Sequence, residues 1–348
     1  MKKILALVLC AIMVFAVVAC DTTKEAEYKL GMGVVVSMDS SATNNAQVDA
    51  TVATVVTDAD GKIVACRIDV AQSKMDVTGG AVDTAKKFET KMELGSRYGM
   101  EGKVDNDDNG VMLEWDAQAK EFEKYVVGMT VAQVEAIKTQ EKKGHQIAVD
   151  EALLKAGCSM QITDFIAAVV AACKDEQGVS FKTAAEFTLG VAAKTTAADS
   201  VAATAEANGT VAMYTDFAAA VVADGKIIAA LNDAIQPKIT INAAGEIVEK
   251  TYKATKRNLK EEYGMAPAID FGMDWNGDGK VLEWYLQSAE FSKYVVGKSA
   301  DEVANLATKE VEGKGYVISA DDALLNAGCT IQITSIKAVM AQAAKNAR

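Results

Sequence analysis

The chain has 348 residues, of which 50% are hydrophobic and 24% charged, with a formal net charge of −12 at pH 7. This is the composition of a globular protein, and the length suffices for about two domains that each bury a core. The acidic excess argues against nucleic acid as a partner, and against an anionic lipid surface held by charge alone.

The first twenty residues have the pattern of an export signal. A basic start, Lys2-Lys3, precedes an unbroken apolar run over residues 4–18, which is shorter than the roughly 20 residues of a membrane-spanning helix. The ending Val-Val-Ala-Cys20 resembles the lipobox of bacterial lipoproteins, which implies cleavage before Cys20 and a lipid on its sulfur. We therefore expect a signal peptide at 1–20, a tether at 21–27 and anchoring on the extracytoplasmic face of the cell membrane.

Four further cysteines and one histidine bear on metal binding. Cys66, Cys158, Cys173 and Cys329 form no CxxC pair, and His145 is the only histidine. A zinc site built from Cys and His is therefore not expected. Three of these cysteines lie in apolar runs, which is typical of buried free thiols, although disulfides remain open in an exported protein.

Four segments occur twice, in the same order. ELGSRYGM (93–100) matches NLKEEYGM (258–265), LEWDAQAKEFEKYVVG (113–128) matches LEWYLQSAEFSKYVVG (282–297), DEALLKAGCSMQIT (150–163) matches DDALLNAGCTIQIT (321–334), and DADGKIVA (58–65) matches VADGKIIA (222–229). Such repetition indicates a duplicated unit. We expect two tandem homologous domains, at 28–176 and 180–348. The polar segment 174–178 divides them, and few contacts should cross it because each copy is long enough to bury its own core.

Within each copy, predicted strands come first and predicted helices follow. Segments 28–36, 47–56 and 62–71 are rich in Val and Ile with partial alternation, which favours strands. Asp58-Ala-Asp-Gly61 is a hairpin turn signal, and residues 223–226 repeat it. This order predicts the α+β class, with an antiparallel hairpin region followed by helices in each domain.

The helical part of each copy has recognisable helix ends. Residues 113–127 place apolar side chains on one approximate face of a helix. Thr130-x-x-Gln133 and Ser299-x-x-Glu302 are capping boxes that open a further helix. A short helix should end at Gly157 and Gly328, and a last apolar helix should run from about Thr163 and Thr334.

One loop in each copy has the spacing of a calcium ligand set. Asp105, Asp107 and Asn109 occupy the first, third and fifth positions of an EF-hand-like loop, with Gly110 sixth and Asp116 twelfth. Alternate oxygens at this spacing converge on one Ca²⁺ while the glycine permits the sharp turn. The second copy offers Asp274, Asn276 and Asp278, with Tyr285 at the twelfth position. The alternative is an acidic turn that exposes carboxylates to water.

The end of each copy resembles the FMN-binding domain family. The likeness rests on the hairpin around Gly-Lys-Ile and on a Gly–small–Ser/Thr segment before the last helix, here Gly157-Cys-Ser159 and Gly328-Cys-Thr330. Members of that family carry FMN on a threonine through a phosphoester, with the phosphate near a helix start. The resemblance implies Ser159 and Thr330 as attachment points and places Gly157, Gly328, Thr163 and Thr334 around the cofactor. The residue before each glycine is alanine, where the family has Ser or Thr.

Two functions remain open. The first is a tethered flavoprotein that passes electrons from a membrane donor to a partner protein, in which FMN supplies the chemistry. The alternative is a non-catalytic binding or structural lipoprotein, stabilised by Ca²⁺. A hydrolase is not expected, because the sequence has no G-x-S-x-G, P-loop or HExxH motif.

Overall fold

The computed structural model describes residues 25–266, 274–277 and 279–348. Every strand pair among these residues is antiparallel, and helices accompany the sheets in both halves of the chain. The predicted α+β class with antiparallel sheets is therefore confirmed. Within the described residues, no helix is both long enough and apolar enough to cross a membrane.

Three long strands open the described chain. They are β1 (Ala26–Ser37), β2 (Asn45–Asp58) and β3 (Ile63–Asp76), and each is longer than the strand predicted from the sequence. The predicted hairpin turn joins β2 to β3. Asp58 Oδ1 accepts the backbone N–H groups of Asp60 and Lys62, and Gly61 has a φ of +74°, which this turn requires.

The helices of the first half follow β3. They are α1 (Lys91–Leu94), α2 (Trp115–Val126), α3 (Val131–Glu135), α4 (Glu151–Lys155) and α5 (Thr163–Cys173), with the hairpin β4 (Thr139–Lys142) and β5 (His145–Ala148) before α4. The predicted capping box of Thr130 and Gln133 opens α3. Helix α5 lies so close to β1 that a Cβ on Gly31 would stand 2.1 Å from the carbonyl oxygen of Ala172. Only glycine permits this approach.

The second half repeats the order of elements of the first, with an additional strand β6 at its start and a small added sheet. Its strands are β6 (Val179–Thr183), β7 (Thr188–Thr196), β8 (Gly209–Ala212), β9 (Tyr214–Ala223), β10 (Lys226–Ile235), β11 (Lys238–Ile241), β12 (Ile247–Thr251), β13 (Thr308–Val311) and β14 (Tyr316–Ser319). Its helices are α6 (Lys256–Leu259), α7 (Trp284–Tyr294), α8 (Ala300–Ala304), α9 (Asp322–Asn326) and α10 (Thr334–Lys345). The capping box of Ser299 and Glu302 opens α8, as predicted.

The small added sheet is β12-β11-β8, which lies beyond the sheet β10-β9-β7. Pro237 lies between β10 and β11. Because proline has no backbone N–H, it interrupts the hydrogen bonds between neighbouring strands. The corresponding first-half strand β3 continues unbroken for 14 residues. The sequence analysis did not predict this small sheet or the hairpins β4–β5 and β13–β14.

Both halves contribute to one central core. The sheets β3-β2-β1-β6 and β10-β9-β7 face each other, and their buried side chains form a single cluster that includes Leu30, Val52, Leu189 and Phe217. Strand β6, which begins the second half, pairs with β1 of the first. The expectation that few contacts cross the boundary is wrong, because each sheet covers the apolar face of the other.

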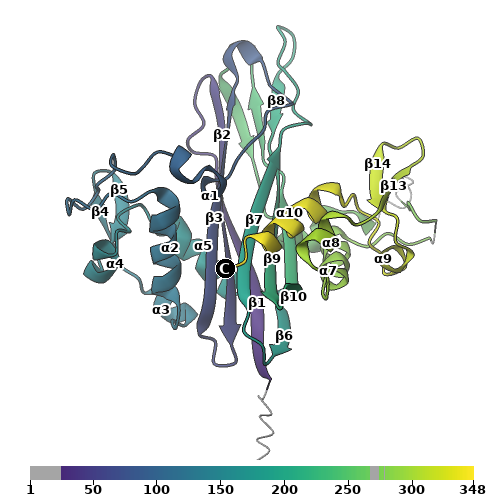
Figure 1. Ribbon diagram of the computed structural model, residues 1–348. Helices are drawn as coiled ribbons and strands as arrows, with labels where there is room; N and C mark the ends of the chain where they lie inside the picture. The colour runs from purple at the N-terminus through teal and green to yellow at the C-terminus, as the bar shows by residue number, and fades with distance from the viewer. Residues whose placement is uncertain (1–24, 267–273, 278) are drawn as a thin grey trace, which may run out of the picture.

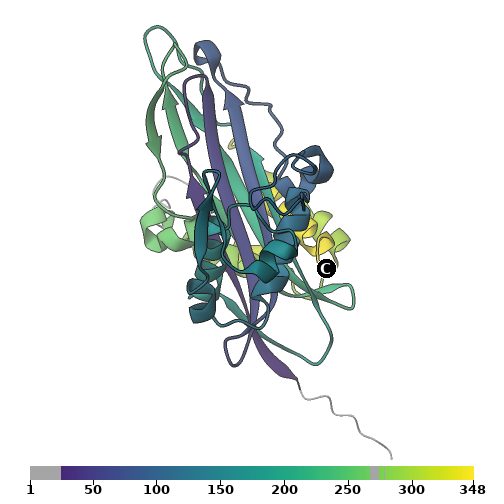
Figure 2. The same ribbon diagram turned by 90° about the vertical axis from the view of Figure 1, so that its left-hand side faces the viewer.

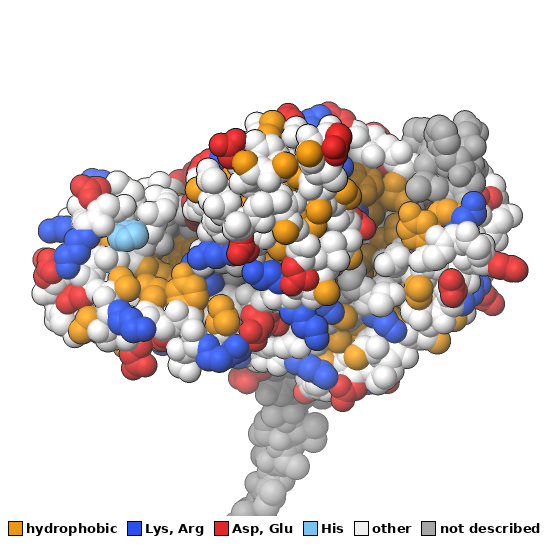
Figure 3. Space-filling model, turned by 90° about the horizontal axis from the view of Figure 1, so that it is seen from above, with side chains coloured by type: hydrophobic (Ala, Val, Ile, Leu, Met, Phe, Trp, Pro, Cys, Tyr) orange, Lys and Arg blue, Asp and Glu red, His pale blue; other side chains and the backbone are white. Residues whose placement is uncertain are grey.

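Two further apolar clusters lie beneath the helices, one in each half. The helices of the first half cover the outer face of one sheet, and those of the second half cover the outer face of the other (Figures 1 and 2). Seen from above, acidic and basic side chains are interspersed over both helical regions and the central strands (Figure 3). This face shows no large area of a single charge.

Candidate functional site

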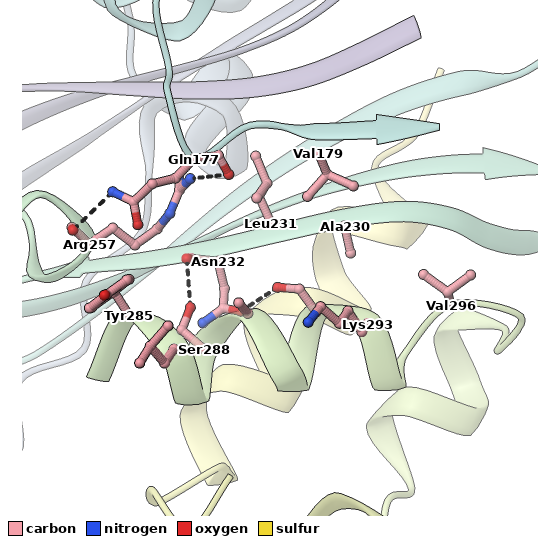
Figure 4. Close-up of a pocket in the computed structure, with 13 residues that line it drawn as sticks. Gln177, Val179, Ala230, Leu231, Asn232, Arg257, Tyr285, Ser288, Lys293 and Val296 are labelled. Carbon is pink, nitrogen blue, oxygen red and sulfur yellow. Dashed lines mark hydrogen bonds between the residues drawn. The ribbon is translucent and has the colours of Figure 1, made fainter. Parts of the chain in front are cut away.

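A mostly apolar pocket lies in the second half, between helix α7, strand β10 and the segment that enters β6. Its volume is about 320 Å³, within the range of small-molecule sites. Val179, Leu231, Leu286 and Val296 supply much of its apolar lining. Figure 4 shows α7 running beneath β10, with Ala230 and Asn232 pointing toward the helix and Leu231 pointing away from it.

Asn232 is one of several polar residues that line this pocket. Its side chain leaves β10 toward α7 and is only 2% exposed. Ser292 Oγ donates to Asn232 Oδ1 at 2.8 Å, and Ser288 Oγ donates to the Asn232 carbonyl oxygen at 3.1 Å. Asn232 Nδ2 is buried and has no hydrogen-bond partner in the described part of the chain. A buried amide left in this state destabilises the fold by about 1–3 kcal/mol.

The cations that line the pocket are both neutralised. Arg257 donates to Asp175 Oδ2 at 3.1 Å and to the Gln177 carbonyl at 2.8 Å. Gln177 Nε2 in turn donates to the Arg257 carbonyl at 3.0 Å, which holds the segment before β6 against α6. Lys293 pairs with Glu290 at 2.6 Å. The pocket therefore presents an amide and apolar surface, without an unpaired charge from either cation.

The first half fills the equivalent position with charge. By the repeated segments, Ile68 and Glu123 stand where the second half has Asn232 and Ser292. Glu123 is 3% exposed, accepts the N–H of Ile68 at 2.9 Å and pairs with Arg348 at 2.7 Å and Arg67 at 3.5 Å. Burial raises the pKa of Glu123, while the nearby Arg348 and Arg67 lower it. The hollow beside this group, of about 310 Å³, is lined by charged residues.

A buried lysine stands next to the pocket wall, one residue before Arg257. Lys256 is 6% exposed, and its Nζ lies 4.7, 4.6 and 5.3 Å from the ring centres of Tyr214, Tyr263 and Trp284. Burial lowers the pKa of Lys256 to about 8, although Asp216 and Asp233 favour its charged form. The rings stabilise the ammonium by cation–π attraction.

The first half repeats this cluster. Lys91 Nζ lies 4.9 Å from the Tyr98 ring centre and 5.4 Å from that of Trp115. Thr90 caps α1 as Thr255 caps α6. The sequence analysis missed this pattern, although Thr-Lys recurs at the same distance before Tyr-Gly-Met in both copies.

The residues implied by the flavin resemblance are buried. Ser159 is 0% exposed and Thr330 is 3% exposed. The N–H groups of Ser159 and Thr330 donate to Gln118 and Gln287 of the preceding helices, and Ser159 Oγ is buried without a partner among the described residues. A phosphoester at either hydroxyl has no room in this arrangement, so the residues present do not fit a covalently held FMN.

The remaining residues of that prediction have structural roles. Gly157 and Gly328 have φ values of +96° and +91° and pack on Leu113 and Leu282. Thr163 and Thr334 are the first residues of α5 and α10, as expected, but neither caps its helix by a side-chain hydrogen bond. The pocket lies elsewhere, since neither Ser159 nor Thr330 is among the residues that line it.

Most polar side chains in the predicted calcium loop of the first half bond within the loop or to Lys143, but Asp107 Oδ1 is buried without a partner among the described residues. Asp105 accepts the N–H groups of Asn109 and Gly110, Asp107 Oδ2 accepts from Asn109 Nδ2, and Lys143 Nζ lies 2.6 Å from Asp108. Asp116 pairs instead with Lys120 on α2. No group of three or more His, Cys, Asp or Glu side chains in the described ranges is arranged to hold a metal ion.

The second-half loop is described in part. Asp274 accepts the N–H of Gly279 at 2.8 Å, as Asp105 does from Gly110. Asn276 Nδ2 donates to the Leu325 carbonyl at 3.4 Å. Asp278 lies outside the described residues, as does Cys20.

The burial of the thiols agrees only in part with the sequence prediction, which expected Cys66, Cys173 and Cys329 in buried apolar runs. Cys66, Cys158, Cys173 and Cys329 are free, and all but Cys173 are fully buried. Burial raises the pKa of Cys158 and of Cys329 to about 12, so neither thiol supplies a reactive thiolate near neutral pH.

Comparisons with known protein families, with curated proteins and with solved structures found no match.

Asn232, Ser288, Ser292 and Arg257 were not singled out by the sequence analysis. The signal that could have found the two serines is the difference between otherwise matching segments. Ser288 and Ser292 replace Ala119 and Glu123 within a stretch that is nearly identical in both copies. Divergence inside a repeat marks positions where the two halves have different tasks.

Proposed function

We propose that this protein is a lipoprotein, anchored on the extracytoplasmic face of the membrane, that binds a small apolar ligand in its second half without transforming it. The observation that carries the proposal is the pocket between α7 and β10, with the buried, unpartnered Nδ2 of Asn232 at its wall. Small-molecule sites are usually apolar cavities with a few placed polar groups.

The proposal includes a tandem duplication in which one copy lost the site. Equivalent residues make equivalent contacts: Gln118 and Gln287 each accept the N–H after a Gly-Cys pair, and Tyr125 and Tyr294 each donate to the aspartate that caps α4 or α9. Glu114 and Glu283 each accept N–H groups of the Tyr-Gly-Met turn. These matches support descent from one unit. The charged group around Glu123 then distinguishes the first half from the second.

The anchoring part rests on the sequence. The lipobox-like ending at Cys20 supports it, and strand β1 begins at Ala26, so only a short tether would separate the fold from the lipid. Changing Cys20 to Ser should release the protein from membranes, because the lipid on this cysteine supplies the anchor. A Cys20→Ser protein that stays membrane-bound would contradict this part.

Flavin carriage stays a separate prediction. Burial of Ser159 and Thr330 speaks against a covalent flavin, and the proposal above assigns no step to FMN. Intact mass of protein made in its native host decides the matter. An added FMN unit that disappears in Thr330→Ala would favour electron transfer over simple binding.

The pocket itself is tested with a neutral apolar dye. N-phenyl-1-naphthylamine should bind the mature protein saturably, with a rise in fluorescence as it leaves water. Ala289 lines the pocket and is exposed, so Ala289→Trp should cover the space and remove binding without disturbing the core.

The matched control is Lys120→Trp, which adds the same ring at the equivalent place on α2 and should leave binding unchanged. Wild-type protein that shows no saturable fluorescence would overturn the proposed pocket. So would equal binding by wild type and Ala289→Trp, because the dye would then bind elsewhere.

A further inference from the structure

We propose that the ligand of the α7–β10 pocket is an uncharged apolar molecule with one hydrogen-bond-accepting oxygen, such as a ketone, ester or amide carbonyl, which Asn232 recognises. This inference rests on the proposed binding function and names the chemical class of the ligand. Its first basis is the state of the Asn232 amide. The oxygen of that amide is used by Ser292, whereas the nitrogen donates to no described residue.

The two serines engage both oxygens of Asn232 and leave its side-chain nitrogen as the atom of this residue's amide without a partner among the described residues. Ser288 Oγ donates to the Asn232 carbonyl and Ser292 Oγ donates to its side-chain oxygen, so both hydroxyl protons are engaged. An amide nitrogen has two donor protons and no acceptor capacity. A ligand carbonyl oxygen would satisfy a donor that is otherwise buried and unpaired, and an apolar ligand would leave it unpaired.

Charge decides against an anionic ligand. Arg257 is paired with Asp175 in an interaction whose two side chains are 6% and 7% exposed, and Lys293 is paired with Glu290. A carboxylate that entered the pocket would lose its hydration and gain at most a hydrogen bond from the Asn232 amide. Both cations that line the pocket, Arg257 and Lys293, are already paired with carboxylates. Removing an ion from water without such compensation is unfavourable. A neutral acceptor avoids this cost.

The first half provides an internal comparison. Ile68 occupies the position of Asn232, and Glu123 occupies that of Ser292. An ionised carboxylate has no proton, so Glu123 in that state is not a hydrogen-bond donor. The first half therefore lacks the side-chain donor, and its hollow is lined by Arg67, Asp116, Lys120 and Arg348 among others. An uncharged amide at this position is therefore a feature of the second half, whereas the donors around the first-half hollow include the charged Arg67, Lys120 and Arg348.

The test compares small ligands of nearly the same shape by displacement of N-phenyl-1-naphthylamine from the full mature protein. They are 2-acetylnaphthalene, which has a ketone, 2-isopropenylnaphthalene, in which a CH₂ group replaces the oxygen, and 2-naphthoate, which is an anion. The ketone should displace the dye at a concentration roughly 5- to 10-fold lower than the alkene, the ratio expected for one net hydrogen bond. Naphthoate should be the weakest of the three.

Variants assign the preference to the amide. Asn232→Ile copies the first half and should abolish the difference between ketone and alkene while the dye still binds. Ser292→Ala removes a neighbour but keeps Nδ2, and should retain the preference. If Asn232→Ile fails to fold, the comparison of the three ligands with wild-type protein still tests the predicted preference for the ketone.

The outcomes separate the two proposals. Saturable dye binding with equal displacement by ketone and alkene would overturn the ligand class and leave the pocket standing. A stronger effect of naphthoate, or of 1-(2-naphthyl)ethanol over the ketone, would also overturn it, because the site would then favour an anion or a donor. Absence of saturable dye binding would instead remove the proposed function.

Discussion

Arg257 and Asp175 form a buried ion pair across the boundary between the two halves of the chain. The guanidinium lies 3.1 Å from Asp175 Oδ2, and the same carboxylate oxygen accepts the N–H of Met32 on β1 at 3.1 Å. One aspartate therefore connects strand β1, the end of α5 and helix α6. By the repeat, the equivalents of Arg257 and Asp175 are Met92 in the first half and Asn346 at the end of the second, which form an uncharged version of the pair.

Replacing Arg257 by Met should destabilise the protein by about 3–5 kcal/mol, because Asp175 would be left as a buried, uncompensated charge. The double variant Arg257→Met, Asp175→Asn copies the uncharged pair and should recover most of that loss. Urea unfolding followed by circular dichroism measures both. A double variant as unstable as the single one would show that the charge of Asp175 is not the cause.

The halves should not fold separately. Buried residues of both sheets form the central cluster, and β6 completes the first-half sheet from beyond the boundary. Fragments 27–176 and 180–348 would each expose one apolar face to water, so neither should unfold cooperatively alone. Mixing them should restore a cooperative transition.

The control for this experiment is the intact chain cleaved between 176 and 180 after folding, which should stay associated. Cooperative unfolding of either isolated fragment would show that the central cluster is not needed for stability. Thermal unfolding followed by tryptophan fluorescence suits this comparison, because Trp115 and Trp284 lie in different halves.

Asp69 should make stability fall as the pH rises. Its side chain is 2% exposed, and burial raises its pKa from 3.8 to about 6 despite hydrogen bonds from Thr90, Met92 and Val70. Between these two pKa values the folded state keeps a proton that the unfolded state has lost. The free energy of unfolding should therefore drop, by about 2.4 kcal/mol from this group, as pH rises from 4 to 7.

The variant Asp69→Asn lacks this titrating group, so the measurement compares the pH dependence of its unfolding free energy with that of the wild type. The difference in unfolding free energy between wild type and variant should change by that amount over pH 4–7 and then become constant. Buried Asp216 and Asp233 also have raised pKa values, but they are present in both proteins and cancel in the difference. Parallel stability curves for the two proteins would contradict the assignment.

We propose that Ca²⁺ competes with Lys143 for the loop at 105–111. Lys143 Nζ lies 2.5 Å from the Asp105 carbonyl and 2.6 Å from Asp108 Oδ1, which places a positive charge against the oxygens that calcium would use. Lys143→Ala should increase the rise in melting temperature caused by millimolar Ca²⁺, to roughly 2–4 °C. Asp105→Ala with Asp107→Ala should remove it. If each of the three proteins has the same melting temperature with Ca²⁺ as with chelator, the loop does not bind Ca²⁺ and is an ordinary acidic turn.

The sequence by itself determined the local structure of this protein. The hairpin at Asp58–Gly61, the capping boxes at Thr130 and Ser299 and the helix starts at Thr163 and Thr334 depend on residues close together in the chain. Turn and cap chemistry is local, so a short stretch of sequence is enough to predict it. The repeat made each of these predictions twice.

The tertiary structure alone decided how the halves meet and where the pocket lies. Apolar alternation predicts that a strand has a buried face but does not show which sheet covers that face. The sequence therefore predicted two separate cores, where the structure has one core shared by both halves. Asn232 and Ser292 are 60 residues apart in the chain and meet because α7 packs across β10. Ser159 and Thr330 follow a family motif, yet packing against Gln118 and Gln287 buries them. Exposure and long-range pairing depend on the whole fold, which local patterns do not encode.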